Sequence, residues 1–136
     1  MAHRICLIDD DFMVRDALAT ALRAAGFEVY PSPGAAAGID LAGRMRFDAI
    51  ITDVSMPGTD GCALIAEARA RWPDLAILAI SGYPSLNGRS PADAAEALGA
   101  DATLSKPFKA SQLVAAINSA MTNRGLPCPG RAAAQE

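Results

Sequence analysis

Residues 48–58 read DAIITDVSMPG, an apolar run that ends at Asp53 and leads directly into a turn. A second apolar run, residues 4–8, also ends in acids, namely Asp9, Asp10 and Asp11. A carboxylate at the tip of a core strand is well placed for chemistry. Two strand ends that both open into carboxylates therefore predict one shared acidic pocket.

Short apolar runs alternate with stretches of helical character along the whole chain. The runs cover residues 5–8, 27–30, 49–52, 76–80 and 102–104. This alternation predicts an α/β fold, a doubly wound parallel sheet of five strands with helices on both faces. We expect the strand order 2-1-3-4-5, which makes the first and third strands neighbours where ligands bind in such sheets. Asp9, Asp10 and Asp53 would then converge.

The expected helices carry recognisable end signals. Asp11 is expected to cap the first helix, and Gly26 to end it in a left-handed conformation. Ser32 followed by Pro33 predicts the start of the second helix. The third helix is expected over residues 61–71.

Composition and charge exclude several classes of protein. The 136 residues are 51% hydrophobic and 20% charged, which fits one compact domain. A net charge of -3, with scattered Lys and Arg, disfavours direct nucleic-acid binding. The longest apolar stretch, residues 75–80, is too short to span a bilayer, and no signal peptide is recognisable. We therefore expect a cytoplasmic protein without a membrane partner.

The cysteines and the single histidine suggest no site of their own. Cys6, Cys62 and Cys128 are widely separated and contain no CxxC pair, which argues against disulfides and zinc. Cys6 and Cys62 are expected in the core. His3 lies before the first strand and is expected to be solvated, so any histidine chemistry must come from a partner.

Two later strand ends add other polar groups, Ser81 and Lys106. Three carboxylates in close range repel one another by about several kcal/mol, so a cation should lie among them. Oxygen ligands in small number favour Mg²⁺, and Mn²⁺ could substitute. Acids, a metal, a lysine and a hydroxyl together suit in-line phosphoryl transfer, with Asp53 as the nucleophile.

Taken together, these residues resemble the receiver domain of bacterial two-component response regulators, in a stand-alone form like the chemotaxis regulators. The resemblance runs from residue 3 to residue 123. Its four pieces are the acidic pair after the first strand, the motif from Asp53 to Gly61, Ser81, and Lys106 followed by Pro107 and Phe108. It implies a flavodoxin-like receiver domain over residues 1–123. Residues 124–136 have no periodicity and cannot bury enough apolar surface to fold alone, so we expect a flexible tail there.

The resemblance implies that a histidine kinase or a histidine phosphotransfer protein donates a phosphoryl group to Asp53. Mg²⁺ would be held by Asp10, Asp53, the backbone carbonyl of Ser55 and, mainly through water, Asp9. The protein would not be an enzyme in the usual sense, although it would assist its own phosphorylation and its slow dephosphorylation. It would signal to a downstream protein by contact, or pass the phosphoryl group on in a relay.

By the same resemblance, Lys106 would pair with the phosphoryl group and Ser81 would swing its hydroxyl toward it as a switch. Two features depart from the family pattern. Thr103 occupies the switch position that is usually aromatic, with Tyr83 or Phe108 as the nearest aromatic candidates. The connection over residues 82–90, before a helix expected over 90–98, looks longer than usual, which is typical of a mobile lid or a partner surface.

Two other functions remain open on the sequence alone. One is an interaction module with the receiver fold that works without phosphorylation, for which Thr103 leaves a small opening. The other is a phosphohydrolase with an aspartyl nucleophile, as in haloacid-dehalogenase-like enzymes. Those enzymes need a second acid two residues after the nucleophile, and Ser55 occupies that position.

Overall fold

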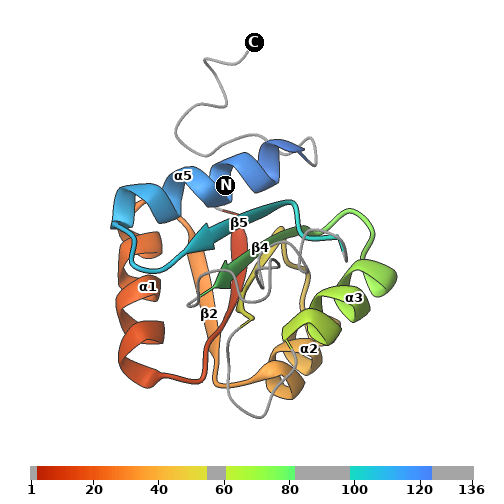
Figure 1. Ribbon diagram of the computed structural model, residues 1–136. Helices are drawn as coiled ribbons and strands as arrows, with labels where there is room; N and C mark the ends of the chain where they lie inside the picture. Colours follow the sequence, from red (N-terminus) through yellow and green to blue (C-terminus); the bar gives the residue numbers. More distant parts are fainter. Residues whose placement is uncertain (1–2, 55–60, 82–98, 124–136) are drawn as a thin grey trace, which may run out of the picture.

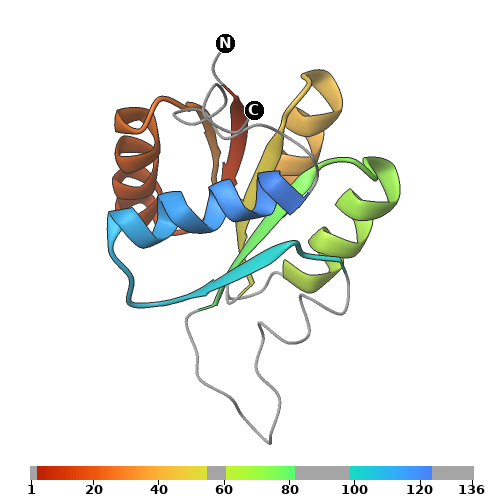
Figure 2. The ribbon, with the colours of Figure 1, turned by 90° about the horizontal axis from the view of Figure 1, so that it is seen from above.

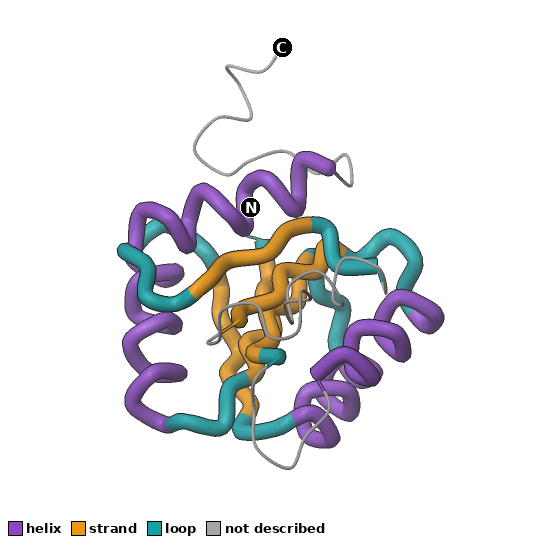
Figure 3. Tube along the Cα trace, viewed as in Figure 1, coloured by secondary structure: helices purple, strands orange, loops and turns teal. Residues whose placement is uncertain are grey.

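The computed structural model describes residues 3–54, 61–81 and 99–123. These residues form a parallel sheet with helices on both faces (Figure 1 and Figure 3). The strand order is β2-β1-β3-β4-β5, as predicted. The carboxyl ends of β1 and β3 are therefore neighbours. The strands are β1 (Arg4–Ile8), β2 (Glu28–Ser32), β3 (Ala49–Asp53), β4 (Ala76–Ser81) and β5 (Ala102–Ser105).

The described helices cover the two faces of the sheet in pairs. Figure 1 and Figure 2 show α1 (Phe12–Ala24) and α5 (Ala110–Asn123) on one face, with α2 (Ala35–Arg44) and α3 (Gly61–Arg71) on the other. Because side chains alternate along a strand, each face of the sheet builds an apolar core of its own. None of these helices is long and apolar enough to cross a membrane.

Several predicted features lie outside the described residues. They are Ser55, Tyr83, the connection over residues 82–90, the helix expected over 90–98, and the tail over 124–136.

The predicted start of the second helix is wrong by two residues. Ser32 is the last residue of β2 and is paired with Ile8, and its carbonyl accepts a hydrogen bond from the Asp9 N–H at 3.2 Å. Pairing in the sheet therefore overrides the local capping signal. The N-cap is Gly34 instead, which has no side chain to cap the helix. The left-handed stop at Gly26 is confirmed, with φ at 101°.

Helix α2 approaches β1 closely, at two points. Cys6 is fully buried, as expected, and its thiol donates to the Gly38 carbonyl at 3.8 Å. Burial raises the pKa of this thiol to about 12, so Cys6 is an inert core residue. A Cβ added at Gly38 would lie 2.3 Å from Cδ1 of Ile8. The absence of a side chain at Gly38 therefore lets α2 lie against the strand that leads into Asp9.

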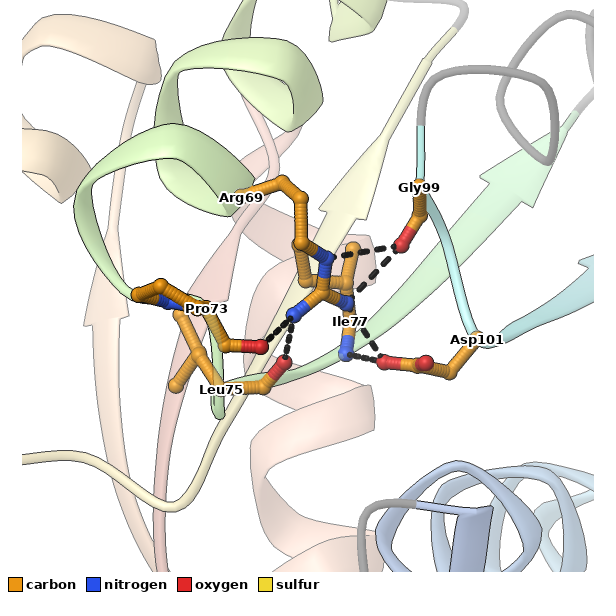
Figure 4. A network of polar contacts seen from close by, with 6 residues as sticks. All are labelled: Arg69, Pro73, Leu75, Ile77, Gly99 and Asp101. Atoms are coloured by element: carbon orange, nitrogen blue, oxygen red, sulfur yellow. Dashed lines mark hydrogen bonds and ion pairs between the residues drawn. The ribbon is translucent and has the colours of Figure 1, made fainter.

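Arg69, near the end of α3, ties three chain segments together (Figure 4). Its guanidinium donates from all of its N–H groups: to the carbonyls of Pro73 and Leu75, twice to that of Gly99, and to the Asp101 carboxylate at 2.7 Å. The planar fork of an arginine suits such an arrangement, whereas a lysine has only three donors on one atom.

The Asp101 carboxylate completes this network from the other side. Its Oδ2 atom also accepts the Ile77 N–H at 2.8 Å. Both charged side chains are mostly buried, at 18% exposure for Arg69 and 7% for Asp101. The network therefore joins the end of α3 to the beginning of β4 and to the residue that precedes β5.

Replacing Arg69 by lysine should lower the free energy of unfolding by about 3 kcal/mol, because Asp101 and several carbonyls lose their donors. Arg71→Lys is the matched control two residues away. Arg71 is exposed and pairs with Glu67 at 3.4 Å, so its replacement should cost less than about 1 kcal/mol. Urea unfolding followed by circular dichroism measures both. Equal losses would show that the network adds no stability of its own.

Gly38→Ala should destabilise the protein by about 2 kcal/mol, because the added methyl overlaps the fully buried Ile8. Gly43→Ala, on the same helix, is the control. There the new Cβ would meet only Nη2 of Arg71, at 3.4 Å, so helix propensity should stabilise the variant by up to about 1 kcal/mol. Opposite shifts in melting temperature are expected, and a stabilised Gly38→Ala would contradict the close packing.

Candidate functional site

Asp53 is the last residue of β3 and is buried, with only 4% of its surface exposed. Its Oδ2 atom accepts a hydrogen bond from Nζ of Lys106 at 2.8 Å. Lys106 directly follows β5, and its backbone N–H donates to the Ser81 carbonyl at 2.8 Å. Asp53 and Lys106, which the sequence predicted to face each other, are therefore in contact.

The charge of Lys106 depends on Asp53. Burial lowers the pKa of the Lys106 ammonium, but its hydrogen bond to the Asp53 carboxylate and the negative charges of Asp53, Asp9 and Asp11 outweigh that effect. The net pKa lies above the usual range. Lys106 is therefore a firmly protonated cation directly on the Asp53 carboxylate.

Asp9 is the most constrained acid of the site, with 1% of its surface exposed. Its Oδ1 atom accepts the Asp11 N–H at 2.9 Å, whereas its buried Oδ2 atom has no hydrogen-bond partner among the described residues. Burial raises the pKa of the carboxyl, and the charges of Asp53 and Asp10 add to that. The hydrogen bond from Asp11 and the charge of Lys106 act in the opposite direction. Asp9 is thus a buried carboxylate near Asp53 whose charged form is disfavoured.

The next two acids differ from Asp9 in burial and role. Asp10 is exposed, although its charge still reaches Asp9. Asp11 is the N-cap of α1, as predicted, because its Oδ1 atom accepts the N–H groups of Met13 and Val14 at 2.9 and 3.2 Å. Of the predicted acids, Asp9 and Asp53 are brought together in a buried position, and Asp10 lies at their edge.

The expected switch residues lie on β4 and β5. Ser81 is buried and registered against Ser105, and Thr103 is half-buried and registered against Ala79. The Ser81 carbonyl is bonded to Lys106, which places Ser81 beside the site through its backbone.

The donor atoms of the site fit a hard divalent cation. Asp9 and Asp53 supply carboxylate oxygens, and the unpartnered, buried Oδ2 of Asp9 is a ligand atom that such an ion would satisfy. Within residues 3–54, 61–81 and 99–123, no three His, Cys, Asp or Glu side chains are gathered into a ready metal site. Further ligands would therefore have to come from Asp10 by a side-chain movement, from water, or from the chain beyond β3.

Arg15 contacts the site and was not predicted from the sequence. Arg15, on α1, donates from Nη1 to the backbone carbonyl of Asp9 at 2.8 Å. Its position one helical turn after the Asp11 cap is the only signal that could have indicated it.

The expectation that the His3 side chain is solvated is wrong. Its side chain is mostly buried and lies 3.4 Å from the Asp48 carboxylate, at the amino end of β1, far along the strand from Asp9.

The sequence matches a known protein family over most of its length. The sequence matches the response regulator receiver domain over residues 5–118. The chain therefore belongs to the response regulator receiver domain family, whose members act in two-component systems.

Curated relatives are regulators from several bacteria. FixJ of Bradyrhizobium diazoefficiens is 36% identical over 97% of this chain and 63% of its own length. PrrA of Mycobacterium tuberculosis is 34% identical over 90% of this chain and 51% of its own. For FleR of Pseudomonas aeruginosa the values are 35%, 84% and 24%. The chain thus spans less than two thirds of the length of these relatives.

Solved structures show the same fold over most of both chains. The CheY-like receiver domain protein of Methanospirillum hungatei superimposes with a TM-score of 0.83 at 25% identity, over 92% of this chain and 98% of its own. CheY4 of Vibrio cholerae gives a TM-score of 0.76 at 26% identity, over 85% and 95%. The predicted flavodoxin-like receiver fold is therefore confirmed.

Asp9→Asn should stabilise the metal-free protein by about 1 kcal/mol at neutral pH, because it removes a buried charge that lacks a partner on Oδ2. A raised carboxyl pKa means that the wild type loses stability as the pH rises through the folded pKa. Below the unfolded pKa both states are protonated and the loss is absent. The gap between variant and wild type should therefore close in acid.

Urea unfolding in EDTA over a series of pH values measures this gap. Asp10→Asn is the matched control and should change stability less, because Asp10 is exposed. A destabilised Asp9→Asn at neutral pH would show that burying the charge of Asp9 does not cost stability.

Proposed function

We propose that this chain accepts a phosphoryl group on Asp53 from a phosphohistidine of a histidine kinase or a histidine phosphotransfer protein. The observation that supports this most is the buried Asp53 carboxylate bonded to the Lys106 ammonium at 2.8 Å. Phosphoryl transfer to a carboxylate brings further negative charge to a site that already contains Asp9. A fixed cation on the acceptor itself is therefore what the reaction needs.

In this proposal Asp9, Asp10, Asp53 and the backbone carbonyl of Ser55 hold Mg²⁺, with Mn²⁺ as a substitute. The bound ion would supply neutralisation of charge on the phosphoryl oxygens. The unpartnered Oδ2 atom of Asp9 and the raised pKa of its carboxyl support this assignment, since both indicate a carboxylate that gains by meeting a cation. Ser55 lies outside the described residues.

The proposed chemical step uses the carboxylate of Asp53 and the ammonium of Lys106. A carboxylate oxygen of Asp53 forms a bond to phosphorus while the bond between phosphorus and the donor's imidazole nitrogen breaks, and the imidazole leaves with the electron pair. Lys106 then moves its hydrogen bond from the Asp53 carboxylate to a phosphoryl oxygen. The nucleophile is a carboxylate paired with the Lys106 ammonium, so no proton has to be removed from it.

We further propose that Ser81 and Thr103 form the switch that reports phosphorylation to a downstream protein. Ser81 lies at the end of β4, next to the Lys106 backbone, and Thr103 lies two residues earlier on the neighbouring strand. Thr103 has no ring, so the coupling from Asp53 to the surface around β5 should differ from that of relatives with an aromatic residue there.

Acetyl phosphate with Mg²⁺, or a phosphorylated histidine kinase, should label the wild type with one acid-stable, base-labile phosphoryl group. Asp53→Asn should remove the label completely, whereas Asp74→Asn, at an exposed acid before β4, should leave it unchanged. EDTA should also abolish labelling. Mass spectrometry of the intact protein provides the measurement.

Persistent stoichiometric labelling of Asp53→Asn would overturn the assignment of the acceptor. A wild type that is never labelled and binds no Mg²⁺ in a titration would instead support a receiver-fold interaction module that works without phosphorylation.

A further inference from the structure

The guanidinium of Arg15 contacts both the acidic site and an exposed ring. Its Nη1 atom donates to the backbone carbonyl of Asp9 at 2.8 Å. Its carbon lies 5.5 Å from the centre of the Phe12 ring, within the range of a cation–π interaction. Both contacts are made from α1, whose first turn begins directly after the acids.

Asp9 makes three hydrogen bonds, and two of them come from residues at the start of α1. Its N–H donates to the Ser32 carbonyl at 3.2 Å, its Oδ1 atom accepts the Asp11 N–H, and its carbonyl accepts Arg15. The sheet supplies only the first of these bonds. The direction in which the carboxylate projects is therefore set by the two bonds from the start of α1.

We propose that Arg15 is a positioning residue for the acidic site, which fixes the backbone of Asp9 so that its carboxylate can meet the cation, and that the Phe12 ring keeps Arg15 in place. The inference rests on the proposed function for the nature of that cation. It assigns Arg15 no contact with the phosphoryl group.

The exposed ring of Phe12 supports this role. Phe12 is 67% exposed, so it contributes little to either apolar core. Its ring face is used instead by the guanidinium of Arg15. Met13, the next residue, is exposed to 77% and offers no ring face, which makes it a control of similar exposure on the same helical turn.

The simpler explanation is that Arg15 only anchors α1 to the sheet. Arg23, two turns later on the same helix, does this elsewhere: its Nη2 atom donates to the Val29 carbonyl at 2.9 Å. Arg15 and Arg23 thus make the same bond from the same helix, but only Arg15 makes it to an acid of the site. A comparison of these two arginines separates positioning from anchoring.

Charge and positioning predict opposite results for Arg15. Removing a positive charge beside carboxylates should by itself strengthen Mg²⁺ binding. Loss of a residue that orients a ligand typically weakens metal binding by about tenfold or more. Weaker Mg²⁺ binding by an Arg15 variant can therefore not be an effect of charge.

The test is a calorimetric titration of the full chain with Mg²⁺ alone. Arg15→Met should raise the dissociation constant about tenfold, and Arg15→Lys, which can still donate to the carbonyl, should recover part of the loss. Phe12→Ala should raise it by a smaller factor. Arg23→Met and Met13→Ala should leave it unchanged, although the melting temperature of Arg23→Met should fall about as far as that of Arg15→Met.

A second measurement needs no metal. In EDTA, Arg15→Met should shift the amide proton of Asp11, because the bond from that N–H to Oδ1 of Asp9 depends on the Asp9 backbone. Arg23→Met should not shift it. Unchanged Mg²⁺ affinity and an unchanged Asp11 amide in Arg15→Met, or equal effects of the two arginine variants, would overturn the positioning role.

The two proposals fail in distinguishable ways. If the wild type binds no Mg²⁺, the proposed function is in error, whereas the Asp11 amide in EDTA still decides whether Arg15 positions Asp9. If Mg²⁺ binds and Asp53 is labelled while Arg15→Met behaves like Arg23→Met, only the inference about Arg15 is lost.

Discussion

The mutual repulsion of two buried carboxylates is the constraint on which the site depends. Asp9 directly follows β1 and Asp53 ends β3, and the strand order β2-β1-β3-β4-β5 makes these two strands neighbours. Each is almost completely buried, and the pKa of Asp9 is raised mainly by this burial and further by the charge of Asp53. A protein selected for stability alone would have no reason to keep both, so their cost indicates a function that uses them.

The rest of the structure supports these acids from several sides. Gly38 lets α2 lie against Ile8, which directly precedes Asp9, and Arg15 holds the Asp9 carbonyl from α1. Lys106 neutralises Asp53 from the end of β5. Two apolar cores and the Arg69 network stabilise the sheet independently of the site. They therefore hold Asp9 and Asp53 close together even though the two carboxylates repel each other.

The sheet and the contact between Asp53 and Lys106 could be predicted from the sequence, because both depend on the periodicity of the apolar runs. The alternation of apolar runs and helical stretches gave the sheet, and the positions of Asp53 and Lys106 at strand ends gave their contact. The errors arose where tertiary pairing outweighs a local signal. Ser32 pairs with β1 in the sheet instead of capping α2, and His3 contacts the Asp48 carboxylate instead of solvent.

The bonds of Arg15 and Arg69 were beyond prediction for a related reason. Arg15 donates to a backbone carbonyl, and four of the five bonds of Arg69 also go to carbonyls; every residue has a carbonyl, so no partner residue type marks these bonds in the sequence. A hydrogen bond between two side chains, such as that of Lys106 with Asp53, leaves a trace in residue identity. A bond to a carbonyl appears only once the chain is folded.

The absence of a ring at Thr103 does not isolate the site from the surface, because the ends of β4 and β5 are joined by another route. The Lys106 N–H is bonded to the Ser81 carbonyl, while the Lys106 ammonium is bonded to Asp53. In the proposed reaction the ammonium moves from the carboxylate to a phosphoryl oxygen. By that proposal, the movement would act on the backbone at the end of β5 and, through the carbonyl, on Ser81. Lys106 would therefore connect the proposed acceptor to β5 without an aromatic side chain.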